Sequence, residues 1–133
     1  MLVLSVRQPW AWLIIHGGKD IENRNWTTNV RGRVLIHASK STTKREWAES
    51  WDSVHRICPD AWAKGVREIR PGTIALGGII GSVEIVDCVN KSDSPWFFGR
   101  FGYVLRDPQP IPFFQCRGKL GFFQCPEYVE KHL

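Results

Sequence analysis

The segment from Gly18 to Arg24, with the sequence GKDIENR, concentrates the side chains best suited to chemistry. Residues 19–26 look extended, and in a strand alternate side chains share a face, so Glu22, Arg24 and Trp26 project together. Either charge is costly to bury alone, whereas a paired carboxylate and guanidinium form a rigid polar clamp. The segment therefore predicts a polar cleft with an aromatic wall.

Other polar residues are candidates for the same cleft. Lys19 follows the Gly17–Gly18 turn and can reach the face that carries Glu22. Glu84 lies in an otherwise apolar segment, where a lone carboxylate usually needs a cation such as Lys19 or Arg24. Four further polar residues lie at the ends of predicted elements, namely Gln8, His37, Ser39 and Lys40. The side-chain amide of Gln8 suits the edge of a base.

A plainer interpretation of the pair stays open. Glu22 and Arg24 would also be expected on an ordinary exposed strand, where a surface ion pair contributes little to stability. The pattern of charges alone does not separate this interpretation from a functional cleft.

Periodicity and breaking residues predict the elements that must position these side chains. A helix over 8–18 begins near Pro9, which suits a first helical position, and ends at the left-handed stop offered by two glycines. The other expected elements are a strand over 2–6, an extended segment over 19–26, a strand over 33–37, a helix over 41–57, a helical turn over 59–62, a break at 71–72, a strand with a glycine bend over 73–89, a loop over 90–95, and strands over 101–105 and 119–124 separated by a proline-rich turn over 107–112.

These elements predict an α+β fold: a small β-barrel of about five to six strands with two to three flanking helices, because the order has no βαβ rhythm. The chain has 133 residues, of which 43% are hydrophobic and 12% aromatic, which suits one packed core. We therefore expect a single domain over residues 1–133. Its seven Trp are expected mainly in the core, including Trp47 and Trp51.

The net charge of +5 is unevenly distributed. Residues 1–70 contain twelve Lys and Arg against seven Asp and Glu, whereas residues 71–133 contain six of each class. A basic surface raises the local concentration of polyanions. The asymmetry favours nucleic acid as a partner.

The four cysteines, Cys58, Cys88, Cys116 and Cys125, show no C-x-x-C pair. This spacing argues against a zinc site or a disulfide framework, so we expect reduced thiols, no metal and no cofactor. The first ten residues carry Arg7 and Pro9, unlike a signal peptide. We expect a cytoplasmic protein that does not enter a membrane and is a monomer rather than an obligate oligomer.

Four ordered blocks resemble the ASCH domain family of the PUA-like superfamily. They cover residues 4–11, 18–24, 31–39, and the C-terminal stretch from 101–105 through 117–123, which is similar to stand-alone bacterial and phage members. The second block fits the family motif G-x-K-x-x-E-x-R. The resemblance implies a PUA-like barrel with a helix beside a cleft lined by Lys19, Glu22 and Arg24.

The resemblance also implies the kind of ligand. Relatives of the fold bind RNA or flipped bases, in which an aromatic side chain stacks on the base and polar groups read its edge. The stacking candidates are Trp10, Trp26 and Trp96. We therefore expect an RNA- or nucleobase-binding domain.

Two other functions remain open. Some ASCH relatives resemble hydrolases that cut RNA or remove an acyl group from a modified cytidine, for which Lys19 and Glu22, or His37 with Lys19, are catalytic candidates. In the amide-hydrolysing branch, a threonine nucleophile stands three residues after the motif lysine; here that position is Glu22, so the mechanism does not carry over intact. The second is a protein-interaction module of the coactivator type, which predicts an exposed apolar patch over 96–98; that segment also suits a lid over the cleft.

Overall fold

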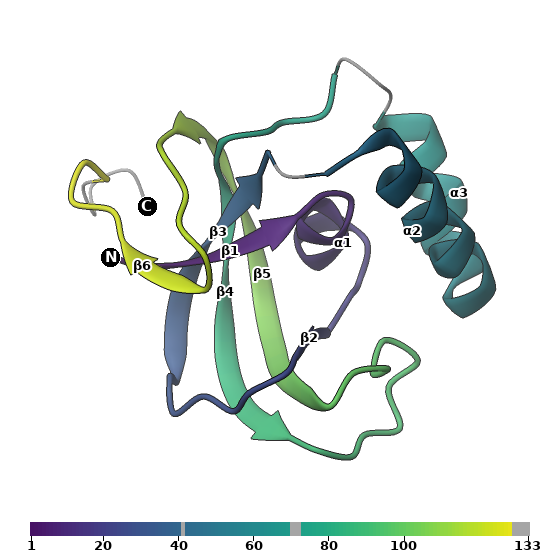
Figure 1. Ribbon diagram of the computed structural model, residues 1–133, viewed down its shortest axis with the longest axis horizontal. Coiled ribbons are helices and arrows are strands. Elements are labelled where there is room, and N and C mark those ends of the chain that lie inside the picture. Colours follow the sequence, from purple (N-terminus) through teal and green to yellow (C-terminus); the bar gives the residue numbers. More distant parts are fainter. Residues whose placement is uncertain (41, 70–72, 129–133) are drawn as a thin grey trace.

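The computed structural model describes residues 1–40, 42–69 and 73–128, which form six strands and three helices. The elements in chain order are β1 (Leu2–Arg7), α1 (Trp10–His16), β2 (Ile21–Arg24), β3 (Gly32–Ser39), α2 (Lys44–Ile57), α3 (Pro59–Glu68), β4 (Gly78–Val89), β5 (Phe101–Gln115) and β6 (Phe122–Gln124). The strands make one sheet in the order β2-β5-β4-β3-β1-β6. Figure 1 shows this sheet curling into a half-barrel, with α2 and α3 side by side at one end.

The long central strands give the sheet its curl. β1 and β3 run parallel, and every other neighbouring pair runs antiparallel. The β4–β5 register shifts three times and the β3–β4 register once. Such bulges bend a strand and increase its twist. The predicted α+β class and the numbers of strands and helices are confirmed.

Helix α1 is buried on nearly all sides, as its apolar sequence predicts. Ala11, Ile14 and Ile15 pack into the core enclosed by the curled sheet. Trp12 and Leu13 face a second apolar cluster, which includes residues of α2 and α3. Because α1 is fixed from both sides, the position of the chain that leaves its end is fixed too.

The prediction of a proline-rich turn over 107–112 is wrong, because this segment lies within β5. β2 pairs only with residues 101–104, so beyond that point β5 has β4 on one edge and no β2 partner on the other. Prolines occupy positions 108, 110 and 112, where their nitrogens carry no hydrogen to donate to a neighbouring strand. An edge without a ladder partner tolerates proline.

Other boundaries differ less. α3 extends well beyond the single turn expected, and β6 is shorter than the strand expected there. Pro9 precedes α1 as its N-cap residue rather than occupying its first turn. α2 begins after Thr43, which forms a capping box with Glu46. The expected helix start at residue 41 and the expected break at 71–72 lie outside the described residues.

The four cysteines are free thiols. In the described ranges, no group of three or more His, Cys, Asp and Glu side chains is placed so that it could hold a metal ion. None of the helices there combines the length and apolar composition that crossing a bilayer requires.

Packing of α3 on α2 depends on Gly65. A Cβ at this position would lie 2.6 Å from Cζ3 of the Trp51 indole. Replacing glycine by alanine within a helix usually stabilises a protein by about 0.5–1 kcal/mol, but overpacking a well-packed contact costs about 1–3 kcal/mol. We expect Gly65→Ala to lower the free energy of unfolding, measured by urea titration. In a Trp51→Phe background the same change should cost less, and equal costs in both backgrounds would contradict the contact.

Candidate functional site

A cleft of about 550 Å³ opens where β1, β2 and two loops meet. The loops are those that precede β5 and β6. Its lining comes from five short stretches of the chain: Ser5, Val6, Arg7, Trp10, Lys19, Glu22, Asn23, Arg24, Asn25, Trp26, Ser39, Phe98, Gly99, Leu120 and Gly121. The structure thus brings together six of the predicted site residues, namely Trp10, Lys19, Glu22, Arg24, Trp26 and Ser39.

Glu22 bridges two cations at the floor of the cleft. Nζ of Lys19 donates to Oε1 of Glu22 at 3.1 Å, and also to the carbonyl oxygen of Ile21. Nε and Nη2 of Arg24 donate to Oε2 of Glu22 at 3.1 and 2.9 Å. Nη2 also donates to the carbonyl oxygen of Ser5 at 2.6 Å, which ties β2 to β1. The co-facing pair expected from strand alternation is therefore an ion pair in which two guanidinium nitrogens bind one carboxylate oxygen, while Lys19 binds the other oxygen.

The three charged side chains are largely withdrawn from solvent. The exposed fractions are 1% for the Lys19 side chain, 10% for Glu22 and 17% for Arg24. Loss of solvation lowers the pKa of Lys19, and the neighbouring Glu22 carboxylate partly opposes this effect. This burial separates the cluster from the ordinary surface ion pair that the sequence left open.

Local structure explains how Lys19 reaches this position. α1 ends at His16, with Gly17 as its C-cap, and Gly18 has φ of +77°, a left-handed conformation that favours glycine. The amide of Lys19 then donates to the carbonyl oxygen of Leu13 at 3.1 Å. The motif glycines are thus the turn that directs the lysine from the end of the helix into the cleft.

Three aromatic side chains surround this charged floor. The Trp10 and Phe98 rings have centroids 5.9 Å apart, and Nζ of Lys19 lies 5.8 Å from the Trp10 ring centroid. Trp26 and Phe98 are 61% and 55% exposed. Exposed aromatic rings beside buried polar groups are unusual for packing alone and offer stacking surfaces.

Asn23 is a residue that the sequence reasoning missed. Its Oδ1 accepts from the amides of Phe98 and Gly99 at 3.0 and 2.9 Å, and its Nδ2 donates to the carbonyl oxygen of Trp96 at 2.9 Å. One side chain thus holds the 96–99 segment at the mouth of the cleft. The available signal was an asparagine inside a strand, where this residue type is depleted.

Several predicted site residues lie elsewhere. Trp96 is 3% exposed and belongs to the second apolar cluster, so Phe98 takes the place at the cleft that was expected of it. Glu84 is paired with Arg106 at 2.8 Å, and the expected partnership with Lys19 or Arg24 is wrong. Gln8 is buried.

The Gln8 amide serves the backbone. Its Oε1 accepts from the amide of Trp12 at 2.9 Å, and its Nε2 donates to the carbonyl oxygen of Ala75 at 3.1 Å. Both ends of the amide are therefore engaged within the protein, and Gln8 does not line the cleft.

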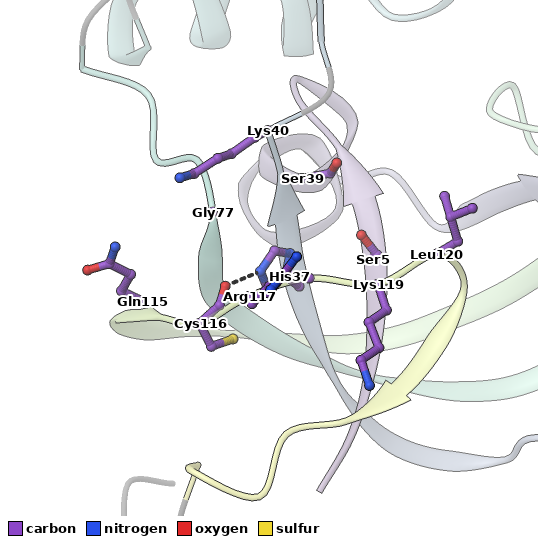
Figure 2. Close-up of a pocket in the computed structure, with 11 residues that line it drawn as sticks. Ser5, His37, Ser39, Lys40, Gly77, Gln115, Cys116, Arg117, Lys119 and Leu120 are labelled. Carbon is purple, nitrogen blue, oxygen red and sulfur yellow. Dashed lines mark hydrogen bonds between the residues drawn. The ribbon is translucent and has the colours of Figure 1, made fainter.

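A second cavity of about 750 Å³ adjoins the cleft, and His37, Ser39 and Lys40 line it. Figure 2 shows His37 at its centre, bonded through Nε2 to the carbonyl oxygen of Cys116 at 2.8 Å. The structure thus places His37 apart from Lys19, and the two do not form one base-and-stabiliser pair in a single cavity.

The arrangement suits binding more directly than proton transfer. Both oxygens of Glu22 face cations, so the carboxylate as placed has no oxygen left without a cationic partner. The three bonds donated by Arg24 use Nε and Nη2 and leave Nη1 for a ligand acceptor. The cluster carries a net charge of +1, which favours an electron-rich ligand edge.

Replacing Glu22 by Gln tests this cluster, because two cations would then lie together without a carboxylate. Breaking a buried pair in this way costs about 3–5 kcal/mol. We expect such a loss of unfolding free energy at pH 7, measured by urea titration. In contrast, Glu49→Gln, which disrupts the exposed Arg45–Glu49 pair, should change it by less than about 0.5 kcal/mol.

The loss in Glu22→Gln should also depend on pH. Without Glu22, the pKa of Lys19 falls further below its ordinary value of 10.5. Between that lowered pKa and 10.5 the unfolded chain binds more protons than the folded chain, so stability rises with pH. The deficit relative to the unsubstituted protein should therefore shrink from pH 7 to pH 9. A stability deficit that stays constant with pH, or whose pH dependence is unchanged when Lys19→Met is added, would contradict this role of Lys19.

Comparison with known proteins identifies the family. The model of the ASCH domain matches residues 4–97. Human activating signal cointegrator 1 is 29% identical over 121 residues, covering 81% of this chain and 19% of that protein. The mouse protein of the same name is 30% identical over 116 residues, with the same coverage. The chain therefore spans about a fifth of the length of these relatives.

Solved structures agree on the fold. The ASCH protein from Zymomonas mobilis superposes with a TM-score of 0.56 at 13% identity, covering 98% of this chain and 89% of that one. A Tyr-to-Phe mutant of that protein gives 0.57 at 14% identity, with coverages of 95% and 90%. The curled sheet with three helices is thus the PUA-like fold that the resemblance implied. The chain belongs to the ASCH domain family.

Proposed function

We propose that this chain binds single-stranded RNA, or a nucleobase within it, in the cleft around Glu22. The observation that carries the proposal is the pairing of a buried Lys–Glu–Arg cluster with exposed rings, Trp26 and Phe98, at its mouth. A base is flat and apolar on its faces and polar on its edge. It would stack on a ring while its edge meets the donors of Arg24.

The distribution of charge supports a polyanion as the partner. The chain carries a net charge of +5, with the excess in the half that contributes Lys19, Glu22 and Arg24. Attraction of phosphate groups would bring RNA to the cleft, and stacking would then hold a base there. We extend the proposal to free nucleosides as ligands of the cleft.

The interaction-module alternative has weaker support. Of the expected patch over 96–98, Trp96 is buried and Phe97 packs against the second apolar cluster, so only Phe98 is well exposed. The name of the mammalian relatives, activating signal cointegrator 1, belongs to proteins of which this chain spans 19%. A role in protein contacts therefore does not follow for this segment.

For cellular context, we propose a monomer in the cytoplasm. Four free thiols suit a reducing compartment.

Substitution of Trp26 tests the stacking. We expect Trp26→Ala to weaken binding of a short mixed-sequence single-stranded RNA by about 1–3 kcal/mol, roughly 5- to 150-fold in Kd, measured by fluorescence anisotropy. The control is Phe113→Ala, which removes a ring that is 50% exposed but does not line the cleft. Arg24→Ala should also reduce binding sharply, after urea titration has shown that it folds. Binding that both cleft variants retain, but that raised salt abolishes, would show only a basic surface.

A hydrolase is the second candidate, favoured by one observation. Burial lowers the pKa of Lys19, so this ammonium releases a proton more readily than an exposed lysine. If the chain acts on RNA or on an acylated nucleoside, turnover should be lost in Lys19→Met and reduced in Glu22→Gln. Labelled RNA and a panel of acylated nucleosides provide the assay. Turnover that survives both substitutions would remove these residues from the mechanism.

A further inference from the structure

The second cavity carries three cations and no carboxylate among the residues that line it. Lys40, Arg117 and Lys119 contribute the charges, and the remaining lining residues are Ser5, His37, Ser39, Gly77, Gln115, Cys116, Gly118 and Leu120. Figure 2 shows Lys40 and Lys119 on different sides of His37, with their side chains extending in different directions.

These cations differ from others on the sheet. Arg33 is paired with Asp107 at 2.6 Å, and Arg106 with Glu84 at 2.8 Å. Within the described part of the chain, none of the three cations at the second cavity has an ion-pair partner. Lys119 contributes, as the smallest of several causes, to the lowered pKa of Glu127. That carboxylate accepts a hydrogen bond from Sγ of Cys125 and does not line the cavity. Unpaired cations around a cavity favour an anionic ligand.

The cavity is built rather than a chance gap between flexible side chains. His37 is 2% exposed and its Nε2 holds the carbonyl oxygen of Cys116, which anchors the start of the 117–121 segment. Nδ1 of the same ring is buried and has no hydrogen-bond partner among the residues that the structure describes. Gly118 lies against the ring, since a Cβ there would be 2.6 Å from Cε1 of His37. Arg117 and Lys119 therefore flank a fixed point of the backbone.

Lys40 lies close to another glycine. Its aliphatic stem lies across the backbone of Gly77, where an added Cβ would be 3.3 Å from Cδ and closer still to Cε. A larger residue at 77 would therefore displace the lysine. Two glycines thus allow the chain to hold cations from two loops around one cavity.

The second cavity adjoins the cleft. Ser5, Ser39 and Leu120 line both. Leu120 is 97% exposed and stands between them, where an apolar side chain can contact a sugar or a base edge. A ligand that leaves the cleft in this direction meets the unpaired cations next.

We infer that the second cavity binds backbone phosphate groups of the RNA whose base occupies the cleft. This inference rests on the proposed function and sharpens it: the ligand is a nucleotide within a strand rather than a free nucleobase. Arg117, Lys119 and Lys40 meet phosphate oxygens, and His37 is a positioning residue that holds the 117–121 segment in place.

The test uses the full chain and a mixed-sequence single-stranded RNA of eight nucleotides, with Kd measured at several KCl concentrations. Each lost phosphate contact lowers the slope of log Kd against log salt by about 0.7 for a single strand. Arg117→Ala/Lys119→Ala should lower the slope by roughly 0.7–1.4 and weaken binding at least about 10-fold at low salt. Arg117→Lys/Lys119→Arg should restore both values. Arg56→Ala/Lys91→Ala removes the same charge outside both cavities and should leave the slope unchanged.

The outcomes separate this inference from the proposed function. If Arg117→Ala/Lys119→Ala leaves the slope unchanged while Trp26→Ala still weakens binding, the phosphate site is overturned. The proposed binding of a base in the cleft then still stands. An equal fall of slope in Arg56→Ala/Lys91→Ala shows diffuse charge and also overturns it. If only the Arg117/Lys119 variant has an effect and Trp26→Ala and Arg24→Ala have none, the proposed role of the cleft fails while phosphate binding stands.

Discussion

The carboxylate of Glu22 is the interaction on which the cleft depends, because it is the partner of two cations that are otherwise expensive to bury. Its position is set by the pairing of β2 with β5, which places Glu22 opposite Tyr103. The position of Lys19 is set by the end of α1, a helix that two apolar clusters fix from opposite sides. Arg24 links the same carboxylate to the backbone of β1. The core thus determines where three charges meet.

Local chemistry allowed much of this to be predicted from the sequence. Alternation along an extended segment placed Glu22 and Arg24 on one face, and breaking glycines placed Lys19 after a helix. These are interactions between residues close in sequence, for which periodicity and turn chemistry are informative. The order of the predicted elements indicated a small barrel, and the ASCH resemblance added its PUA-like form and the place of Lys19 in the cleft.

The errors lie where the outcome depends on distant neighbours. Glu84 was assigned the wrong cation because its partner, Arg106, is set by the shifted β4–β5 register. The prolines of β5 favour a turn in the sequence, because the sequence does not reveal which strand edge lacks a partner. Trp26 and Trp96 are the same residue type, yet one is exposed and the other is buried. Only the packing around each indole separates a stacking surface from core.

Charge pairing gives the two cavities different chemical characters. In the cleft, one carboxylate lies between two cations and neutralises one of their charges, so the polar groups are preorganised beside the aromatic rings. In the adjoining cavity the cations are uncompensated by any lining carboxylate, so attraction of anions dominates. A nucleotide has the same division, with an uncharged aromatic base attached through a sugar to an anionic phosphate. The shared wall of Ser5, Ser39 and Leu120 lies where the sugar of such a ligand belongs, and this match favours a strand over a free base as the ligand.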